Sequence, residues 1–495
     1  RPCAQPVARR KKKTAGIASR SAWCFWESPG GNASAVQAPP QPLEAMEAWQ
    51  QLATAGTVVL GGAIAWAVLG WRCTAFDPPG VPREWTPLRM RVIQAGARGA
   101  FLGLDIGGTL SKLIVIDPGT ADARSPACKR VVDFVTAHQR FGLTGKRDEH
   151  LALELGDGAV IHLLRFHTRR MPGALALARS QLETCEGVKG AGLTVDCTGG
   201  GSRKFAGAFA REASLTLRAH DELECLVGGL IALLRASPDD EAFALGSGGE
   251  RMGRDLSGSS AFPFIVANVG SGVSIVLVES PDRWRRVSGT PIGGGTFFGL
   301  VNLITGLTSF SEMLSAAAKG DHTAVNLTVG DIYGDSEGVY GLRPDHIAAN
   351  FGKPLAARRM PGDRAEPATS RRECGSDGAA AEADSATPPR VRSGSFHSDG
   401  RFHARTEDVC RAALVMVTDQ VAQAAVMSAK HHGVRRVLFA GSFLRHGSSG
   451  GVPQERLSWA IDAWSGGEAE AIFLKREGYY GALGALLASG DTCAS

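Results

Sequence analysis

Residues 101–116, FLGLDIGGTLSKLIVI, constrain the fold of this chain more than any other stretch. Two apolar runs, each suited to a buried strand, flank a turn that contains Gly107 and Gly108. A turn without side chains lets backbone N–H groups approach a phosphate closely. Asp105 precedes the turn and Thr109 follows it, so a carboxylate that can order hydrated Mg²⁺ stands beside the predicted phosphate contacts. We expect a strand–turn–strand phosphate loop here, although an ordinary glycine hairpin shows the same pattern.

A second glycine hairpin repeats this pattern later in the chain. Phe264–Val269 and Val273–Glu279 are apolar runs that flank Gly270–Gly272. Elsewhere strand-like and helix-like segments alternate, which is typical of an α/β protein. Two such hairpins predict a duplicated, two-lobed α/β fold with one phosphate loop in each lobe and a cleft between the lobes. We expect the N-terminal lobe to comprise residues 98–260 and the C-terminal lobe residues 261–490.

Three further segments predict how the lobes are built. Gly293–Gly295 opens a helix, and its backbone N–H groups are in a position to meet an anion. Ala236–Ser260 is rich in Gly and Ser and predicts a polar connection. Thr406 is expected to cap a long amphipathic helix, Glu407–His432, that ends at Gly433.

Other segments lie outside the predicted lobes or interrupt them. Residues 1–51 are basic, poor in acids and without apolar periodicity, which predicts a disordered leader, either a mitochondrial or other organelle targeting peptide or an ordinary tail. Residues 52–71 carry no charge and are long enough to cross a bilayer, with a buried helix as the alternative. The arginines after this segment would keep the catalytic body in the cytoplasm. Residues 356–405 have few large apolar side chains and predict a disordered insertion.

Charge and cysteine usage exclude several functional classes. The net charge of +5 comes mainly from the basic leader, so we expect no nucleic-acid binding by the body of the protein. The 10 cysteines include no C-x-x-C pair, which argues against a zinc site or a disulfide framework and for a reducing compartment. The sequence also lacks a P-loop and a Rossmann fingerprint.

A series of stretches that covers most of residues 98–490 resembles one known family, in that family's order. They are DIGGTLSKL at 105–113, LLRFHTRRMP at 163–172, CTGGGSRKF at 197–205, HDELECLVGGL at 220–230, FPFIVANVGSGVSI at 262–275, RRVSGTPIGGGTFFGL at 285–300, GDHTAVNLTVGDIYG at 320–334, VLFAGSFLR at 437–445 and AIDAWSGGEAEAIFLKREGYYGALGALL at 460–487. Together they resemble the eukaryotic-type (type II) pantothenate kinases, which belong to the superfamily of actin, Hsp70 and the sugar kinases.

The resemblance implies a fold and a reaction. The fold would be a two-lobed actin-like ATPase, a duplicated ribonuclease H-like unit with an ATP cleft between the lobes. The reaction would transfer the γ-phosphate of ATP to the terminal hydroxyl of pantothenate, the first step of coenzyme A biosynthesis. A homodimer, feedback inhibition by acetyl-CoA or another acyl-CoA, and use of Mg²⁺ are implied as well. A primary alcohol holds its proton tightly, so a carboxylate must accept the proton during transfer, and by resemblance that catalytic base is Glu222.

The resemblance also assigns binding roles, residue by residue. Lys112 would reach back from the second strand of its hairpin to the ATP phosphates as a point charge. Asp105 would order Mg²⁺ through water. The full ATP set is Asp105, Gly107, Gly108, Thr109, Lys112, Gly270, Gly272 and Gly441. The set implied for pantothenate or acyl-CoA is Ser271, Ser274, Arg286, Ala460 and Trp464.

Two departures from the family pattern keep other functions open. Ala206–Ala208 follow a Lys-Phe pair after which the family usually has acidic residues, and Ser442 stands where the family usually carries Asn. One alternative is another kinase of the same fold that acts on a sugar or acetate. A second alternative is a membrane-tethered acyl-CoA sensor without useful turnover.

Overall fold

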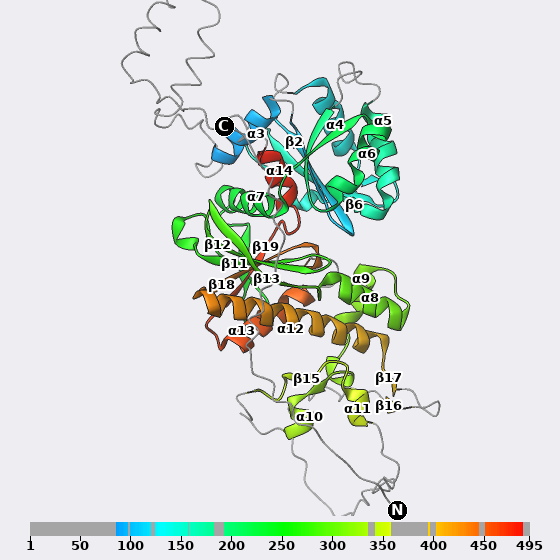
Figure 1. The fold of residues 1–495 in the computed structure, drawn as a ribbon, viewed down its shortest axis with the longest axis vertical. Coiled ribbons are helices and arrows are strands. Elements are labelled where there is room, and N and C mark those ends of the chain that lie inside the picture. The colour runs from blue at the N-terminus through cyan, green and yellow to red at the C-terminus, as the bar shows by residue number, and fades with distance from the viewer. Residues whose placement is uncertain are drawn as a thin grey trace, which may run out of the picture. The chain divides into compact units, whose positions relative to one another are not determined.

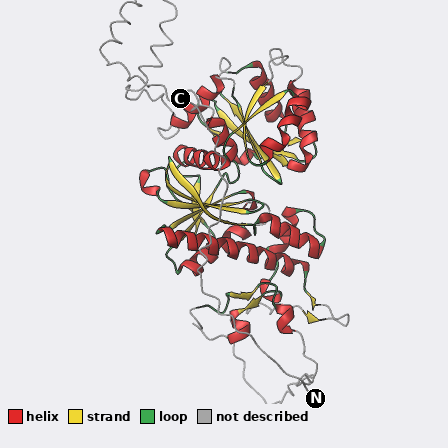
Figure 2. Ribbon diagram, in the orientation of Figure 1, coloured by secondary structure: helices red, strands yellow, loops and turns green. Residues whose placement is uncertain are grey.

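Each glycine hairpin lies in a sheet of its own (Figure 1, Figure 2). The computed structural model describes residues 86–97, 100–119, 124–156, 158–182, 193–334, 342–357, 395–396, 402–444 and 451–488. Every element below belongs to the unit Asp77–Ser495. The predicted leader, residues 1–51, and the predicted membrane span, residues 52–71, lie outside the described residues. So does most of the predicted insertion, residues 356–405.

The first sheet is built around the first hairpin. Strands β1 and β2 are its arms, and β6 pairs antiparallel with β2. On the other side, β7 and then β8 continue the sheet parallel to β1. The strands are β1 (Leu102–Ile106), β2 (Leu110–Asp117), β3 (Arg140–Phe141), β4 (Gly145–Arg147), β5 (Leu153–Glu154), β6 (Val160–His167), β7 (Leu193–Thr198) and β8 (Leu215–Ala219).

The second sheet is built around the second hairpin in the same way. Strands β11 and β12 are its arms, and β13 pairs antiparallel with β12. Strands β18 and then β19 continue parallel to β11, and β9 and β10 complete the edge beyond β19. The strands are β9 (Ala242–Leu245), β10 (Arg251–Gly253), β11 (Phe264–Val269), β12 (Val273–Ser280), β13 (Arg283–Thr290), β18 (Arg436–Ala440) and β19 (Glu470–Leu474).

The shared strand order establishes the fold. In each sheet the two hairpin arms and the three strands named with them, β6, β7 and β8 or β13, β18 and β19, give five neighbouring strands in the order third, second, first, fourth, fifth along the chain. An antiparallel three-stranded meander followed by two parallel strands is the ribonuclease H-like arrangement, and its repetition makes the actin-like two-lobed fold. The predicted fold class is therefore confirmed. Strand β11 shows why the sequence favours it, because a central strand covered on both faces is almost uniformly apolar and buried.

Helices cover the sheets. The long helix α12 runs along the second sheet (Figure 1) and buries its apolar residues against β11, β13 and helix α13. It begins at Thr406 itself, with Arg405 as the N-cap residue, and Gly433 ends it in the left-handed conformation at φ +65°. The helices are α3 (Thr86–Ala97), α4 (Pro126–Ala137), α5 (Met171–Leu182), α6 (Gly201–Ala213), α7 (Glu222–Ala236), α8 (Gly294–Thr305), α9 (Phe310–Ala317), α10 (Val329–Tyr333), α11 (Lys353–Ala357), α12 (Thr406–His432), α13 (Val452–Ser465) and α14 (Tyr480–Ala488). Two small hairpins pair β14 (Leu327–Thr328) with β15 (Ile347–Ala349) and β16 (Ser395–Phe396) with β17 (Phe402–His403).

The division predicted at residue 260 does not hold for two elements. Strand β9 lies within the segment predicted as a polar connection, yet it pairs with β19 of the second sheet. Helix α14, near the C-terminal end of the described residues, packs against α7, β1 and β7 of the first lobe. The approach of α14 to α7 depends on glycine, because a Cβ at Gly229 or Gly484 would overlap a backbone carbonyl of the facing helix.

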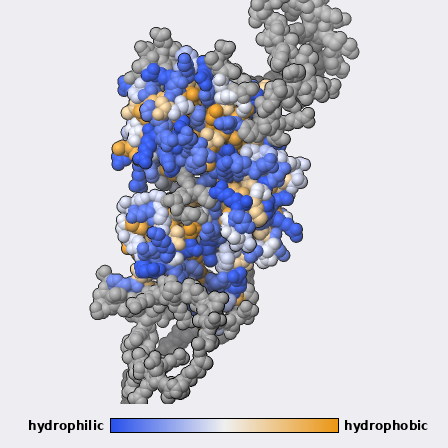
Figure 3. Space-filling view, turned by 180° about the vertical axis from the view of Figure 1, so that it is seen from behind, coloured by the Kyte–Doolittle hydropathy of each residue, from blue (hydrophilic) through white to orange (hydrophobic). Residues whose placement is uncertain are grey.

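Only one helix among the described residues, α12, is long and apolar enough to cross a membrane, and most of that stretch is buried inside the protein. A core helix passes this test as readily as a membrane span does. Figure 3 shows a mainly hydrophilic surface on one face, with hydrophobic residues in small groups. Scattered apolar residues of this kind are normal for a folded domain.

Candidate active site

A cleft of about 600 Å³ brings the tips of the two hairpins to one place. The first hairpin contributes Gly107–Thr109, and the second contributes Gly270–Gly272. Of the predicted site residues, the cleft is lined by Asp105, Gly107, Gly108, Thr109, Lys112, Glu222, Gly270, Ser271, Gly272, Ser274, Arg286 and Gly441. Residues widely separated in sequence therefore converge on one cleft.

The first hairpin is fixed from behind by Thr168, a buried residue that follows β6. Its hydroxyl donates to the carbonyl oxygen of Gly107 at 2.8 Å, and its backbone N–H donates to the carbonyl of Thr109 at 2.9 Å. The hydroxyl of buried Ser111 lies 3.0 Å from the same threonine hydroxyl. These bonds give the carbonyl groups of Gly107 and Thr109 a donor outside the hairpin and so hold the tip in place.

Asp105 and Lys112 are partners across the first hairpin. They stand opposite each other on β1 and β2, and Lys112 Nζ donates to Asp105 Oδ2 at 3.1 Å. Both side chains are mostly buried, with 14% of Lys112 and 15% of Asp105 exposed. Two glycines make room for the carboxylate, since a Cβ would lie 2.6 Å from Asp105 Oδ1 at Gly199 and 3.3 Å from Oδ2 at Gly481.

The second hairpin is supported by the glycines that open α8. The N–H groups of Gly294 and Gly295 donate to the carbonyls of Gly270 and Ser271, each at 2.9 Å. The prediction that these N–H groups meet an anion is therefore wrong, because the hairpin itself accepts them. The glycines are needed for close packing instead, since a Cβ at Gly293 would lie 2.9 Å from the carbonyl oxygen of Ser271.

Gly441 closes one wall of the cleft where β18 ends. Its backbone is in the left-handed region at φ +107°, and a Cβ there would overlap the carbonyl oxygen of Val269. The neighbouring Ser442 lies next to Gly478, whose φ is +90°. Because Gly441 and Gly478 carry no Cβ, a ligand such as a nucleotide base can approach their backbone closely.

Glu222 is the first residue of α7 and lines the cleft. Asp221 caps the helix, because its carboxylate accepts the N–H groups of Leu223 and Glu224 at 2.9 Å. Burial raises the pKa of Glu222 above its ordinary value, and the carboxylates of Asp105 and Asp221 add to this rise while Lys112 opposes it. A carboxylate with a raised pKa is a stronger proton acceptor, as a general base requires.

Arg286 and Ser274 lie on the strands behind the second hairpin. Ser274 on β12 pairs with Gly289 on β13, and a bulge follows between Ile275 and Val276. Arg286 is exposed, and a Cβ at Gly289 would lie 2.5 Å from its Nη2. The glycine thus leaves room for the guanidinium to extend along the strand toward the cleft, where it can offer a forked pair of donors.

Ala460 and Trp464 do not line the cleft. Ala460 on α13 is fully buried in the core of the second lobe, so no ligand can touch it in this arrangement. The Trp464 ring stacks on His346, with ring centroids 5.3 Å apart and planes inclined by 3°. Their implied role beside the acyl-CoA tail at a dimer interface stays a prediction.

Several cleft residues were not predicted. Asn268 was the one with a visible signal, because its amide interrupts an otherwise apolar strand, β11. The remaining ones gave no local signal, since glycine, threonine and proline in turns are common. They are Leu110, Thr198, Gly200, Leu226, Val273, Gly289, Thr290, Pro291, Ser442, Gly478 and Gly481.

Comparison with known proteins places these features in one family. The family described as Fumble matches residues 101–488. Pantothenate kinase 1 of Arabidopsis thaliana is 32% identical over 334 residues, 66% of this chain and 76% of that protein. Pantothenate kinase 2 of Oryza sativa subsp. japonica is 30% identical over 400 residues, 78% of this chain and 38% of that protein. A 4'-phosphopantetheine phosphatase of Mus musculus is 31% identical over 389 residues, 78% of this chain and 40% of that protein.

The chain spans about two fifths of the length of several of these curated relatives. Among solved structures, a glucokinase from Balamuthia mandrillaris in complex with glucose is similar to this chain, with a TM-score of 0.34 and 13% sequence identity. The match covers 83% of this chain and 100% of the glucokinase chain.

Proposed function

Since this chain belongs to the Fumble family, we propose that it is a pantothenate kinase, which transfers the γ-phosphate of ATP to the terminal hydroxyl of pantothenate. One observation carries the proposal above the others. The carboxylate of Glu222 lines the same cleft as both glycine hairpins, so a base for the acceptor hydroxyl stands beside two sites suited to phosphates.

The hairpins would hold the nucleotide. Backbone N–H groups of Gly107, Gly108 and Gly270 are suited to phosphate oxygens, because no side chain blocks their approach. Lys112 would exchange part of its contact with Asp105 for the more highly charged phosphates, which its long flexible stem allows. The base and ribose would lie along the backbone wall at Gly441.

Asp105 fits a role beside Mg²⁺. The described residues hold no cluster of three or more His, Cys, Asp or Glu side chains that would form an all-protein metal cage. Mg²⁺ commonly keeps several waters and binds through one or two carboxylates together with substrate phosphates, so a single carboxylate suffices. When bound, the ion would neutralise charge on the phosphate oxygens.

Glu222 would accept the proton in the transfer step. The hydroxyl oxygen of pantothenate bonds to the γ-phosphorus as the bond to the bridging oxygen of ADP breaks, and the hydroxyl proton passes to the carboxylate. Its raised pKa suits this task. Ser271, Ser274 and Arg286 would hold the amide and carboxylate oxygens of pantothenate, since they offer hydroxyl and guanidinium donors at the same cleft.

The main alternative is an acyl-CoA sensor without useful turnover. A relative of similar identity carries a different enzyme name, so sequence identity does not decide between these functions. Ala206–Ala208 and Ser442 depart from the family pattern and favour the alternative. The presence of Glu222 and Lys112 in the cleft favours the kinase.

Regulation, assembly and location extend the proposal. We infer inhibition by acetyl-CoA or another acyl-CoA that competes for the cleft, and a homodimer. Exposed apolar residues at the end of α8, Leu303 at 82% and Ile304 at 54%, are surface that a second copy could cover. We place the catalytic body in the cytoplasm, with residues 52–71 as a membrane anchor or the leader as a mitochondrial targeting signal.

ATP-dependent phosphorylation of pantothenate by the full chain tests the proposal. The assay is run with and without acetyl-CoA, with glucose and acetate as other acceptors. Phosphorylation of pantothenate that acetyl-CoA suppresses would support both the activity and its regulation. Phosphorylation of glucose or acetate instead of pantothenate would show that this other acceptor is the substrate. Tight acetyl-CoA binding without turnover on any acceptor would establish the sensor.

A further inference from the structure

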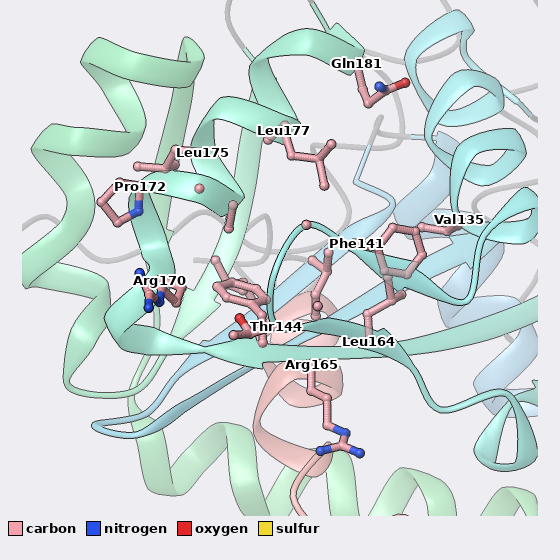
Figure 4. A pocket seen from close by; sticks show the side chains of 18 of the residues that line it. Val135, Phe141, Thr144, Leu164, Arg165, Arg170, Pro172, Leu175, Leu177 and Gln181 are labelled. Carbon is pink, nitrogen blue, oxygen red and sulfur yellow. The ribbon is translucent and has the colours of Figure 1, made fainter.

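A second cavity, of about 430 Å³, lies within the first lobe (Figure 4). It occupies the layer between the first sheet and the helices α4, α5 and α6, where an α/β protein normally packs its core. It shares no lining residue with the cleft that holds Glu222. Nothing proposed above for the kinase reaction uses it.

Small side chains on α5 leave this space open. Gly173, Ala174 and Ala178 line the cavity from the helix, at positions where larger residues would fill the gap. The other walls are apolar, and Figure 4 shows side chains of α4, β6 and α5 gathered around the space. They include Leu102, Leu104, Leu113, Phe134, Phe141, Leu164, Leu175, Val195 and Phe209.

The size and lining of the cavity fit an apolar ligand. Its volume falls within the range of roughly 300–1,000 Å³ that is usual for small-molecule sites and is well above the roughly 150 Å³ that accommodates benzene. An apolar cavity of this size is costly to leave empty, because its walls lose their packing partners. A flexible hydrocarbon chain would restore those contacts.

The entrance is basic. Arg169 and Arg170 follow β6, are exposed and line the cavity, so they stand where it meets solvent. Neither guanidinium makes a hydrogen bond or an ion pair with another residue of the described chain. Arg165 differs, because it pairs with Asp148 at 2.9 Å and points away from the apolar side chains in Figure 4. Among the described residues, no acidic side chain lines the cavity to offset this charge.

An exposed apolar side chain marks the same entrance. Leu143, at the tip of the hairpin between β3 and β4, is 86% exposed and lines the cavity. The entrance therefore joins an apolar surface to two unpaired cations. This combination complements a molecule that is apolar along its length and negatively charged at one end.

We propose that this cavity binds a single-chain amphiphile, a long-chain carboxylate whose hydrocarbon tail fills the apolar space and whose head group pairs with Arg169 and Arg170. A bidentate pairing of guanidinium and carboxylate is among the stronger charged hydrogen bonds. The apolar walls select the chain, and the basic entrance selects the charge.

Binding of cis-parinarate, a fluorescent polyene carboxylate, to the full chain tests the proposal. We expect saturable fluorescence that laurate displaces and that the uncharged lauryl alcohol displaces roughly tenfold less well, because it lacks the charge for the arginines. ATP and pantothenate should not displace the probe. Displacement by ATP would place the ligand in the cleft, and equal displacement by the alcohol would remove the role of the arginines. Either result, or the absence of saturable binding, would overturn the proposal.

Two pairs of variants locate the site. Ala178→Leu fills the cavity and should weaken probe binding roughly tenfold or more, whereas Ala176→Leu, an exposed position on the same helix outside the cavity, should bind like the parent. The double variant Arg169→Gln/Arg170→Gln should lose roughly tenfold in affinity, whereas the exposed Arg211→Gln on α6 should not. If overpacking unfolds Ala178→Leu, the arginine variants, which change exposed residues, still decide. Unchanged binding in the arginine variants would overturn the proposal.

Discussion

The hydroxyl oxygens of Thr109 and Ser271 lie 3.1 Å apart, so a hydrogen bond joins the tips of two hairpins that stand 162 positions apart in the chain. The bond links the two predicted phosphate loops directly, and both residues line the cleft. A phosphate group that binds between the two hairpins would accept a hydrogen bond from one or both of these hydroxyls. A hydrogen bond from a hydroxyl to a charged phosphate oxygen is stronger than a hydrogen bond between two hydroxyls. The exchange of partners therefore favours binding of the nucleotide.

Loss of the Thr109 hydroxyl should therefore weaken ATP binding. We expect Thr109→Val to raise the KM for ATP by roughly tenfold, which corresponds to one charged hydrogen bond. Thr109→Ser keeps the hydroxyl and serves as the matched control, with a KM near that of the parent. Steady-state kinetics over a range of ATP concentrations measure the effect. Equal KM values for all three proteins would show that the hydroxyl bridges the lobes without touching the nucleotide.

Replacement of Glu222 separates chemistry from binding. Glu222→Gln keeps the shape of the side chain and removes its capacity to accept a proton, so kcat should fall by about 10²–10⁴ while ATP affinity is retained. Glu224→Gln is the matched control, because Glu224 lies in the same first turn of α7 and does not line the cleft. Turnover by Glu222→Gln at the parent rate would exclude Glu222 as the base.

The raised pKa of Glu222 predicts the acidic limb of the pH profile. Its causes are burial first and then the carboxylates of Asp105 and Asp221. The base works when ionised, so kcat/KM should fall as pH drops through this raised pKa, at a higher pH than an ordinary glutamate would give. Asp221→Asn keeps the helix cap and removes one like charge, so the limb should move to lower pH. If the acidic limb stays at the same pH in a normally folded Asp221→Asn protein, a group other than Glu222 causes it.

The sequence predicts the hairpins well because their signal is local. A glycine turn between two apolar runs needs only its neighbours to form, and the polar cleft residues Asp105 and Lys112 lie within the first such segment, whereas Glu222 at the start of α7 was assigned by resemblance. The resemblance added Arg286 and Gly441, which no local pattern would identify. It also assigned Ala460, whose full burial depends on the packing of α13 against the second sheet.

Non-local pairing explains what the sequence did not predict. Strand β9 is four residues long and lies in a polar stretch, and its pairing partner β19 is distant in the chain. The role of Gly293–Gly295 was also misassigned, because the N–H groups of Gly294 and Gly295 donate to carbonyls of the second hairpin and that of Gly293 donates to the Thr296 hydroxyl, rather than to a ligand. In both cases the residues that pair with the segment lie too far away in the sequence to belong to the same local pattern.

A buried ion pair beside the cleft provides the last prediction. Glu241, just before β9, is fully buried and accepts hydrogen bonds from the Arg476 guanidinium, from the Arg476 N–H at 3.1 Å and from the Tyr480 hydroxyl. Arg476 also donates to the carbonyl of Leu151 at 2.9 Å, in the first lobe. The pair thus fixes the segment between β19 and α14, which brings Gly478 to the cleft.

Glu241→Ala should destabilise the protein by about 3–5 kcal/mol, because it removes the nearer counter-charge of the buried guanidinium of Arg476 and leaves only the longer, 3.8 Å contact with Asp240. Asp240→Ala is the matched control. The neighbouring Asp240 is 54% exposed; it pairs with Lys475 and lies 3.8 Å from Arg476 Nη2, and an ion pair of so exposed a carboxylate contributes only about 0–1 kcal/mol. Urea titration followed by tryptophan fluorescence measures both free energies of unfolding. If the two variants lost equal stability, solvent would have to reach Arg476, and the proposed anchoring of the Gly478 segment by this pair would fail with it.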